Sequence, residues 1–172
     1  MSYLKSHHDL EQQDNMLVSM DACQATIHKQ KQWHVHIDSP TLADEGAFEM
    51  YFKTPDSTVR ICAEVIFTGE LAGIGCIRES ATVSLSGSVI TVYNRDRNYT
   101  GTSTTSVRSS PTFSASGTCL THIHVGGGKK GFDGGVGAAK FWKLKQGTIY
   151  LFRYTSAAAS NEASISVDFH ED

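Results

Sequence analysis

Features that would suggest a function directly are absent from this sequence of 172 residues. The net charge is only −3, so no basic field is present that would attract nucleic acid or an anionic membrane. No apolar run approaches the roughly 20 residues that a membrane helix needs, and the first residues lack the apolar segment of a signal peptide. We therefore expect neither nucleic acid nor a membrane as a partner, and we expect the chain to fold in a cytoplasm.

Cysteine is scarce and widely spaced. The four cysteines, Cys23, Cys62, Cys76 and Cys119, form no C-x-x-C pair. Thiols stay reduced in a cytoplasm, and cysteine packs as a small apolar group. The spacing therefore predicts free, buried thiols rather than disulfides or a metal site.

Motifs of the common enzyme classes are also missing. There is no G-x-S-x-G nucleophile elbow. Residues 126–131 fit G-x-G-x-x-G, but a dinucleotide site needs a helix to begin there, and residues 132–137 are too rich in glycine to form one. The Walker A pattern fails because Lys129 is followed by Lys130 and not by serine or threonine. The sequence predicts a loop here, no enzyme activity, no cofactor and no catalytic or cofactor-binding residues.

Two H-x-H pairs, His34 with His36 and His122 with His124, are the features closest to a metal motif. Residues two apart on a strand lie on the same face, so each pair places two imidazoles side by side, as in metalloenzymes of the cupin kind. The cupin pattern also needs a glutamate a few residues later, and neither pair has one in that place. We therefore predict polar positions that face solvent or a subunit, and no metal ligands. A cupin-like metal-binding enzyme is the least favoured alternative.

What the sequence does contain is β structure. Apolar and polar residues alternate with a period of two through residues 33–38, 48–53 and 59–68, which places one face of each strand on a core and the other in water. Residues 81–85 and 89–93 flank Ser86-Gly87-Ser88, which predicts a hairpin.

Three further strands are expected near the carboxyl end, over residues 141–145, 148–155 and 164–170. The middle one is apolar on both faces, which is typical of a strand covered on both sides by protein. The last alternates Ile165, Val167 and Phe169 with polar residues. Its pattern predicts a half-buried strand of the core.

The remaining segments complete a prediction of eight to ten strands and no internal helix. Residues 118–125 are expected to form a strand, and the Ser/Thr-rich residues 94–118 a long connection, which is usually functional or mobile. Residues 1–32 are polar and poorly periodic, which predicts an N-terminal arm or edge element. Residues 33–172 then form one antiparallel, jelly-roll-like β-sandwich domain, with an immunoglobulin-like sandwich as the rival.

Four segments of this chain, taken as a set, resemble virion proteins of tailed bacteriophages. They read ATVSLSGSVITVYNRDRN (residues 81–98), SPTF (110–113), GTCLTHIHVGGGKKGFDGG (117–135) and FWKLKQGTIYLFRYTSAAASNEASISVDFHED (141–172). The resemblance covers residues 81–172 well and residues 28–67 more loosely. Most members end in an aromatic residue, tyrosine and glutamate, where this chain has Phe169-His170-Glu171-Asp172.

The resemblance implies a capsid decoration, or cement, protein. Such proteins are jelly-roll-like homotrimers on the outer surface of the head, where they stabilise contacts between major capsid protein subunits. It implies synthesis in the bacterial host cytoplasm, a place in the virion, a structural role and no catalytic residues. The arm, residues 1–32, and residues 94–117 are the segments we expect to face the capsid and neighbouring copies. The alternative is a tail-associated or receptor-binding β-sandwich, for which the loop aromatics Tyr99 and Phe132 are the only hint.

Overall fold

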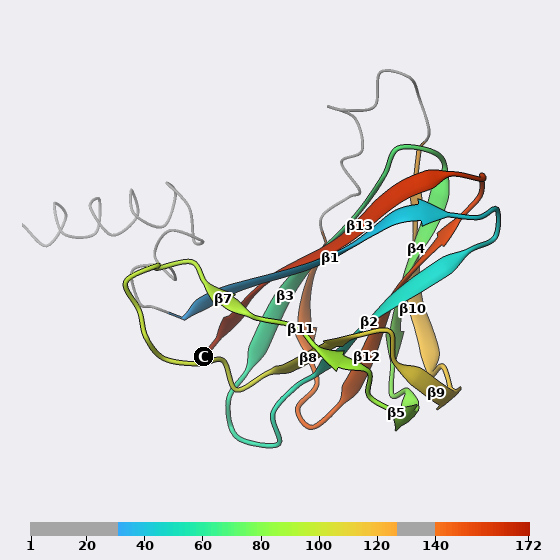
Figure 1. The fold of residues 1–172 in the computed structure, drawn as a ribbon. Helices are drawn as coiled ribbons and strands as arrows, with labels where there is room; N and C mark the ends of the chain where they lie inside the picture. Colours follow the sequence, from blue (N-terminus) through green and yellow to red (C-terminus); the bar gives the residue numbers. More distant parts are fainter. Residues whose placement is uncertain (1–30, 127–139) are drawn as a thin grey trace, which may run out of the picture.

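The structure is a computed structural model, which describes residues 31–126 and 140–172 (Figure 1). The described residues contain thirteen strands and no helix. Two antiparallel sheets contribute to one core, so the predicted all-β antiparallel sandwich is confirmed. The predicted arm, residues 1–32, and the glycine-rich loop, residues 126–137, lie almost wholly outside the described residues.

Sheet A contains, in spatial order, β11 (Lys140–Leu144), β3 (Ile61–Gly69), β13 (Asn161–Glu171), β1 (Gln32–Leu42) and β7 (Tyr93–Asn94). Sheet B contains β10 (Thr118–Val125), β4 (Gly73–Glu79), β12 (Ile149–Ser156), β2 (Ala47–Lys53), β8 (Ser106–Ser109) and β6 (Ser88–Val89). A small third sheet pairs β5 (Thr82–Leu85) with β9 (Thr112–Ala115).

Strands that are neighbours in a sheet are distant in the sequence. β1 to β4 alternate between sheets A and B, and β10 to β13 alternate in the same way. As a result β13 lies between β1 and β3, while β12 lies between β2 and β4. Each half of the chain supplies alternate strands to both sheets, so neither half completes a sheet alone.

The core lies between the two sheets and follows the alternation of the sequence. On β13 the side chains of Ile165, Val167 and Phe169 are buried, and the residues between them are partly exposed. The ring of Phe169 meets that of Phe52 from sheet B edge to face, with centroids 5.1 Å apart. These contacts confirm the predicted last strand and place it at the centre of sheet A.

Residues 73–125 form one long antiparallel ribbon with two bends, which we call the bent ribbon (Figure 1). It begins as β4 paired with β10, continues as β5 with β9 and then as β6 with β8. The backbone takes a positive φ on both strands at each bend, at Ser80 (60°) and Gly117 (73°) and then at Gly87 (80°) and Ser110 (51°). A positive φ places the backbone in the left-handed region, which changes the direction of a strand locally. Glycine adopts this region without a steric penalty.

The bent ribbon corrects two predictions made from the sequence. β5 and β6 do not pair with each other around Gly87, so the predicted hairpin over residues 81–93 is wrong. The predicted connection over residues 94–118 is also wrong in part, because it contains β8 and β9. β5, β6, β8 and β9 are short and rich in serine and threonine, and their partners are distant in the sequence. Neither an apolar period nor local turn chemistry therefore identifies the pairing.

Candidate functional site

The bent ribbon covers part of the outer face of sheet B and reaches both sheets. Val83 and Phe113, from its β5–β9 part, pack on Tyr51 and Leu151. Leu151 is therefore buried on the face of β12 that points away from the main core, as the apolar pattern of residues 148–155 predicts. Further along, β8 pairs with the edge of β2, and β7 pairs with β1 of sheet A.

The second bend of the ribbon exposes two large apolar side chains. Leu85 is 67% exposed and Val89 is 74% exposed, on either side of Gly87. An exposed apolar side chain on its own is ordinary, but two on either side of one bend offer apolar surface to another protein. Phe141 lies on β11, the edge strand of sheet A at the other end from β7, and is exposed to a similar degree, 68%.

An open hollow of about 500 Å³ lies between the ribbon and β1. Val89, Thr91 and Tyr93 line it from the ribbon side, and His36 and Asp38 line it from β1. Both polar and apolar side chains line the hollow, which is open to solvent. Its shape suits a surface contact or a flexible ligand better than an enclosed substrate.

The tip of the bent ribbon, residues 95–105 between β7 and β8, is held on the sandwich by the carboxylate of Glu171. The hydroxyl groups of Ser103 and Thr105 and the backbone N–H groups of Thr104 and Thr105 donate hydrogen bonds to the Glu171 side chain, at 2.7 to 3.2 Å. Tyr99 packs edge to face on Trp33, with centroids 5.9 Å apart. The tip therefore has defined contacts with sheet A, although Tyr99 itself stays 37% exposed.

His34 and His36 lie on the outer face of sheet A, as the H-x-H spacing predicts. Their ring centroids are 5.6 Å apart. Nδ1 of His34 lies 2.9 Å from Oδ1 of Asp168, and Nε2 of His36 lies 4.0 Å from Oδ2 of Asp38. Among the described residues, no group of three metal-ligating side chains gathers around this pair.

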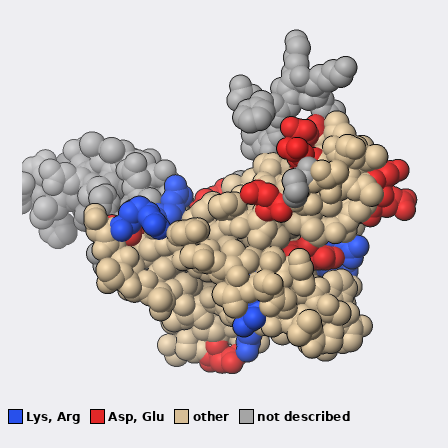
Figure 2. Space-filling model, in the orientation of Figure 1, with Lys and Arg blue, Asp and Glu red and all other residues tan. Residues whose placement is uncertain are grey.

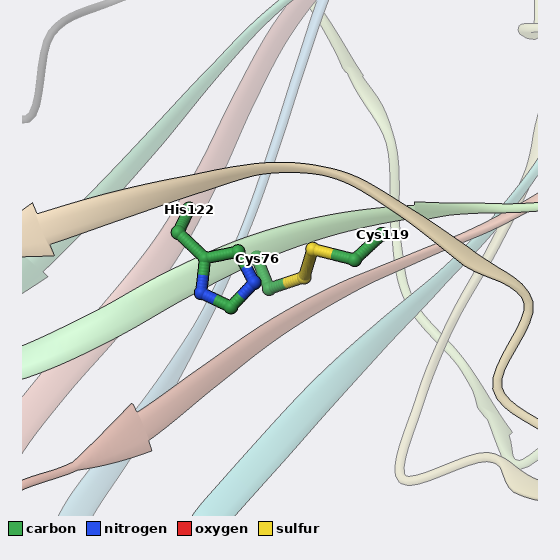
Figure 3. A group of neighbouring side chains, drawn as sticks. All are labelled: Cys76, Cys119 and His122. Carbon is green, nitrogen blue, oxygen red and sulfur yellow. A yellow bond between two sulfur atoms is a disulfide. The ribbon is translucent and has the colours of Figure 1, made fainter.

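The second pair, His122 and His124, lies on the outer face of sheet B and is exposed. His122 stands directly opposite Cys76 of β4. Cys119, three residues before His122, is joined to Cys76 by a disulfide (Figure 3). Ligand atoms of Cys76, Cys119 and His122 all lie within 4.8 Å of one another, which makes this the one group of potential metal ligands among the described residues.

The disulfide corrects the expectation of free thiols for two of the four cysteines. Cys62 is free and partly buried, and burial raises the pKa of its thiol. Cys23 lies outside the described residues. The sequence did not suggest the pairing, because Cys76 and Cys119 are 43 positions apart and come together only when β4 pairs with β10.

A polar cluster at one end of sheet B is structural rather than catalytic in character. The ammonium group of Lys145 donates to Glu79 at 2.6 Å, and the hydroxyl of Tyr150 donates to the same carboxylate at 2.9 Å. The hydrogen bond from Lys145 lowers the pKa of Glu79, and burial raises the pKa of Tyr150 to about 12. At neutral pH Glu79 is therefore ionised and Tyr150 is protonated, so neither group is poised to exchange a proton.

On the face that Figure 2 shows, charge does not single out a site. Figure 2 shows one face of the molecule, on which acidic and basic side chains are scattered among a majority of uncharged ones. In the part of the chain that the structure describes, no helix is long and apolar enough to cross a membrane.

Comparison of the chain with protein-family models, curated proteins and solved structures finds no match. The resemblance to phage virion proteins therefore stays a prediction.

Proposed function

We propose that the chain is a phage capsid decoration protein, which binds the outer surface of the head and stabilises contacts between major capsid protein subunits. The observation that carries this proposal is the strand order. Sheets A and B contain the runs β11-β3-β13-β1 and β10-β4-β12-β2, four strands each. Successive strands of the eight lie in opposite sheets except β4 and β10, which pair with each other in sheet B. This order supports a jelly roll of eight strands, a fold that viral capsid domains use. It agrees with the fold that the resemblance of residues 81–172 implies.

The bent ribbon is the part of the protein that we propose to face the capsid. Its part beyond β4 and β10 is an insertion between the fourth and fifth strands of the eight, and this part exposes Leu85 and Val89 at the second bend. Burying such side chains against a subunit stabilises the complex by roughly 25 cal/mol for each Å² of apolar surface removed from water. The ribbon also carries residues 94–117, which the sequence predicts to face the capsid and neighbouring copies.

Association into a homotrimer is part of the proposal. A shell offers many equivalent sites, and three rigidly linked copies bind with a high effective concentration even where each contact is weak. A trimer is also the state that the resemblance implies.

The proposal is tested by the copy number in purified virions, from quantitative gel densitometry, together with light scattering of the isolated protein. We expect several hundred copies in each particle, a trimer in solution, and heads that lose their DNA at lower temperature when the protein is missing. A handful of copies, or absence from the virion, contradicts the decoration role.

The docking surface is tested separately by a double variant, Leu85→Glu with Val89→Glu, added to heads that lack the protein. We expect it to bind less than the wild type, because two carboxylates must be desolvated at the contact. Phe141→Glu is the matched control, with the same exposure on the opposite edge of the sandwich, and should bind normally. The reverse result would move the contact to the β11 edge.

A tail-associated or receptor-binding role is the second candidate. The observation that favours it is the open hollow lined by Tyr93, His36 and Asp38, because exposed aromatic and polar side chains together suit a glycan. It predicts a few copies at one vertex and weaker adsorption to host cells for Tyr93→Ala.

A further inference from the structure

The group formed by Cys76, Cys119 and His122 is not used by the proposed function. Cys76 is buried in β4, Cys119 is partly buried at the start of β10, and His122 is exposed on β10. Figure 3 shows the imidazole of His122 beside the disulfide. Their sulfur and nitrogen atoms all lie within 4.8 Å of one another.

An irregularity in β10 brings these side chains together. Cys119 and His122 are three positions apart, so in a regular strand they would point to opposite faces of the sheet. The register shifts between Cys119 and Thr121, where two steps along β10 match one step along β4. A β-bulge of this kind re-aims side chains, and here it places Cys119 on the same outer face as His122 and Cys76.

The donor set fits a soft divalent metal. Two thiolates and one imidazole are the ligands that zinc prefers, at about 2.3 Å for sulfur and about 2.0 Å for nitrogen. Three ligands at these distances around one ion lie closer together than 4.8 Å, so small side-chain rotations suffice to close the site. His122 is exposed, which leaves a fourth position for water.

We propose that Cys76, Cys119 and His122 bind one zinc ion when the disulfide is reduced. A dithiol reductant supplies the two electrons: it attacks the disulfide, leaves as its own cyclic disulfide, and the two cysteine thiols are formed. Zinc binding then releases the two thiol protons and forms two Zn–S bonds. The disulfide and the zinc site exclude each other, because they use the same two sulfur atoms.

Either form cross-links β4 to β10, which is the edge strand of sheet B. The edge strand is therefore fastened to β4 in both an oxidising and a reducing compartment. A protein made in a reducing cytoplasm and later exposed outside the cell passes through both conditions.

The experiment is a zinc titration against a chromophoric chelator, with the full chain carrying Cys23→Ser and Cys62→Ser to remove the other thiols. A phosphine is the reductant, because dithiols bind zinc themselves. We expect one zinc per reduced chain and none on the oxidised chain. Cobalt(II) in place of zinc should give a thiolate-to-metal charge-transfer band.

The ligand assignment is tested by His122→Ala, with His124→Ala as the matched control on the same strand and face. Removing even an outer-shell partner of a metal site costs about tenfold to a hundredfold in affinity, so His122→Ala should weaken zinc binding at least tenfold. His124→Ala should leave the affinity unchanged. If reduction unfolds the chain, zinc should restore the fold of the wild type and not that of His122→Ala. The proposal is overturned by a reduced chain that neither binds nor refolds with zinc, or by equal affinities of the two variants.

Discussion

The hydroxyl of Tyr150 donates a hydrogen bond of 2.9 Å to the carboxylate of Glu79, across the pair that β12 forms with β4. The same hydroxyl accepts the backbone N–H of Lys145 at 2.9 Å, and the side chain of Lys145 returns to Glu79. Tyr150 thus ties the loop after β11 to β4 and β12, two inner strands of sheet B, at the end of these strands.

Replacing Tyr150 by phenylalanine should lower the free energy of unfolding by about 1 to 3 kcal/mol, because the Lys145 N–H loses its acceptor and Glu79 loses a donor. Urea denaturation measures the change. Tyr51→Phe is the control, because Tyr51 is also largely buried in sheet B, and no hydrogen bond of its hydroxyl is found among the described residues. Equal effects of the two variants would show that the hydroxyl of Tyr150 contributes nothing specific.

The stability of the protein should fall in alkaline solution. Burial raises the pKa of Tyr150 from 10.0 to about 12, so between these values the unfolded chain loses a proton that the folded chain keeps. The contribution is fully present below pH 10 and is lost as the pH rises towards 12. Thermal unfolding from pH 9 to 12 measures it. Tyr150→Phe should show a shallower decline, and an unchanged decline would contradict the assignment to this group.

Replacing Asn161 by aspartate should destabilise the fold by about 3 kcal/mol or more, since a charge is buried without compensation. The Asn161 side chain is 0% exposed, and its amide nitrogen donates to Ser156, Tyr154 and the carbonyl of Leu71. An ionised aspartate has no N–H group, so it cannot donate the hydrogen bonds that the amide of Asn161 gives to these oxygen atoms. Asn98→Asp, in an exposed part of the ribbon tip, is the control and should change the urea midpoint little.

Replacing Glu171 by alanine should loosen the tip of the bent ribbon without unfolding the sandwich. Thr104 and Thr105 lose the acceptor of their backbone N–H groups. We expect their amide hydrogens to exchange at least about tenfold faster, because losing roughly 1.4 kcal/mol of local stability changes an opening equilibrium tenfold. Amide exchange by NMR is the measurement. Glu162→Ala, exposed near the other end of β13, should leave these two amides unaffected.

Replacing Gly75 by alanine should destabilise the core by about 1 to 3 kcal/mol through overpacking. A Cβ at this position would overlap the ring of Phe67, which is completely buried. Gly126→Ala is the control, since none of the described residues lies within 4 Å of a Cβ at that position. A neutral Gly75→Ala variant would mean that the ring of Phe67 has room to move, and calorimetry distinguishes the two results.

Part of the candidate site was readable in the sequence, and part was not. The H-x-H spacing correctly predicted that His34 and His36 share a face. It did not indicate that His122 joins two cysteines, because the bulge that turns Cys119 to the same side depends on how β10 pairs with β4. Glu171 gave no signal, since its partners lie 66 to 68 positions away.

The sequence by itself determined which residues form the core strands and which faces they bury. Alternation with a period of two is a local property. The spacing of Ile165, Val167 and Phe169 therefore predicts a buried face before any partner strand is known. Only the tertiary structure decided the pairing. The bends at Gly87 and Gly117, the course of the ribbon over Leu151 and the meeting of Cys76 with Cys119 all depend on contacts between distant segments. Such contacts form because the described strands of both halves pack around one core, which no local pattern encodes.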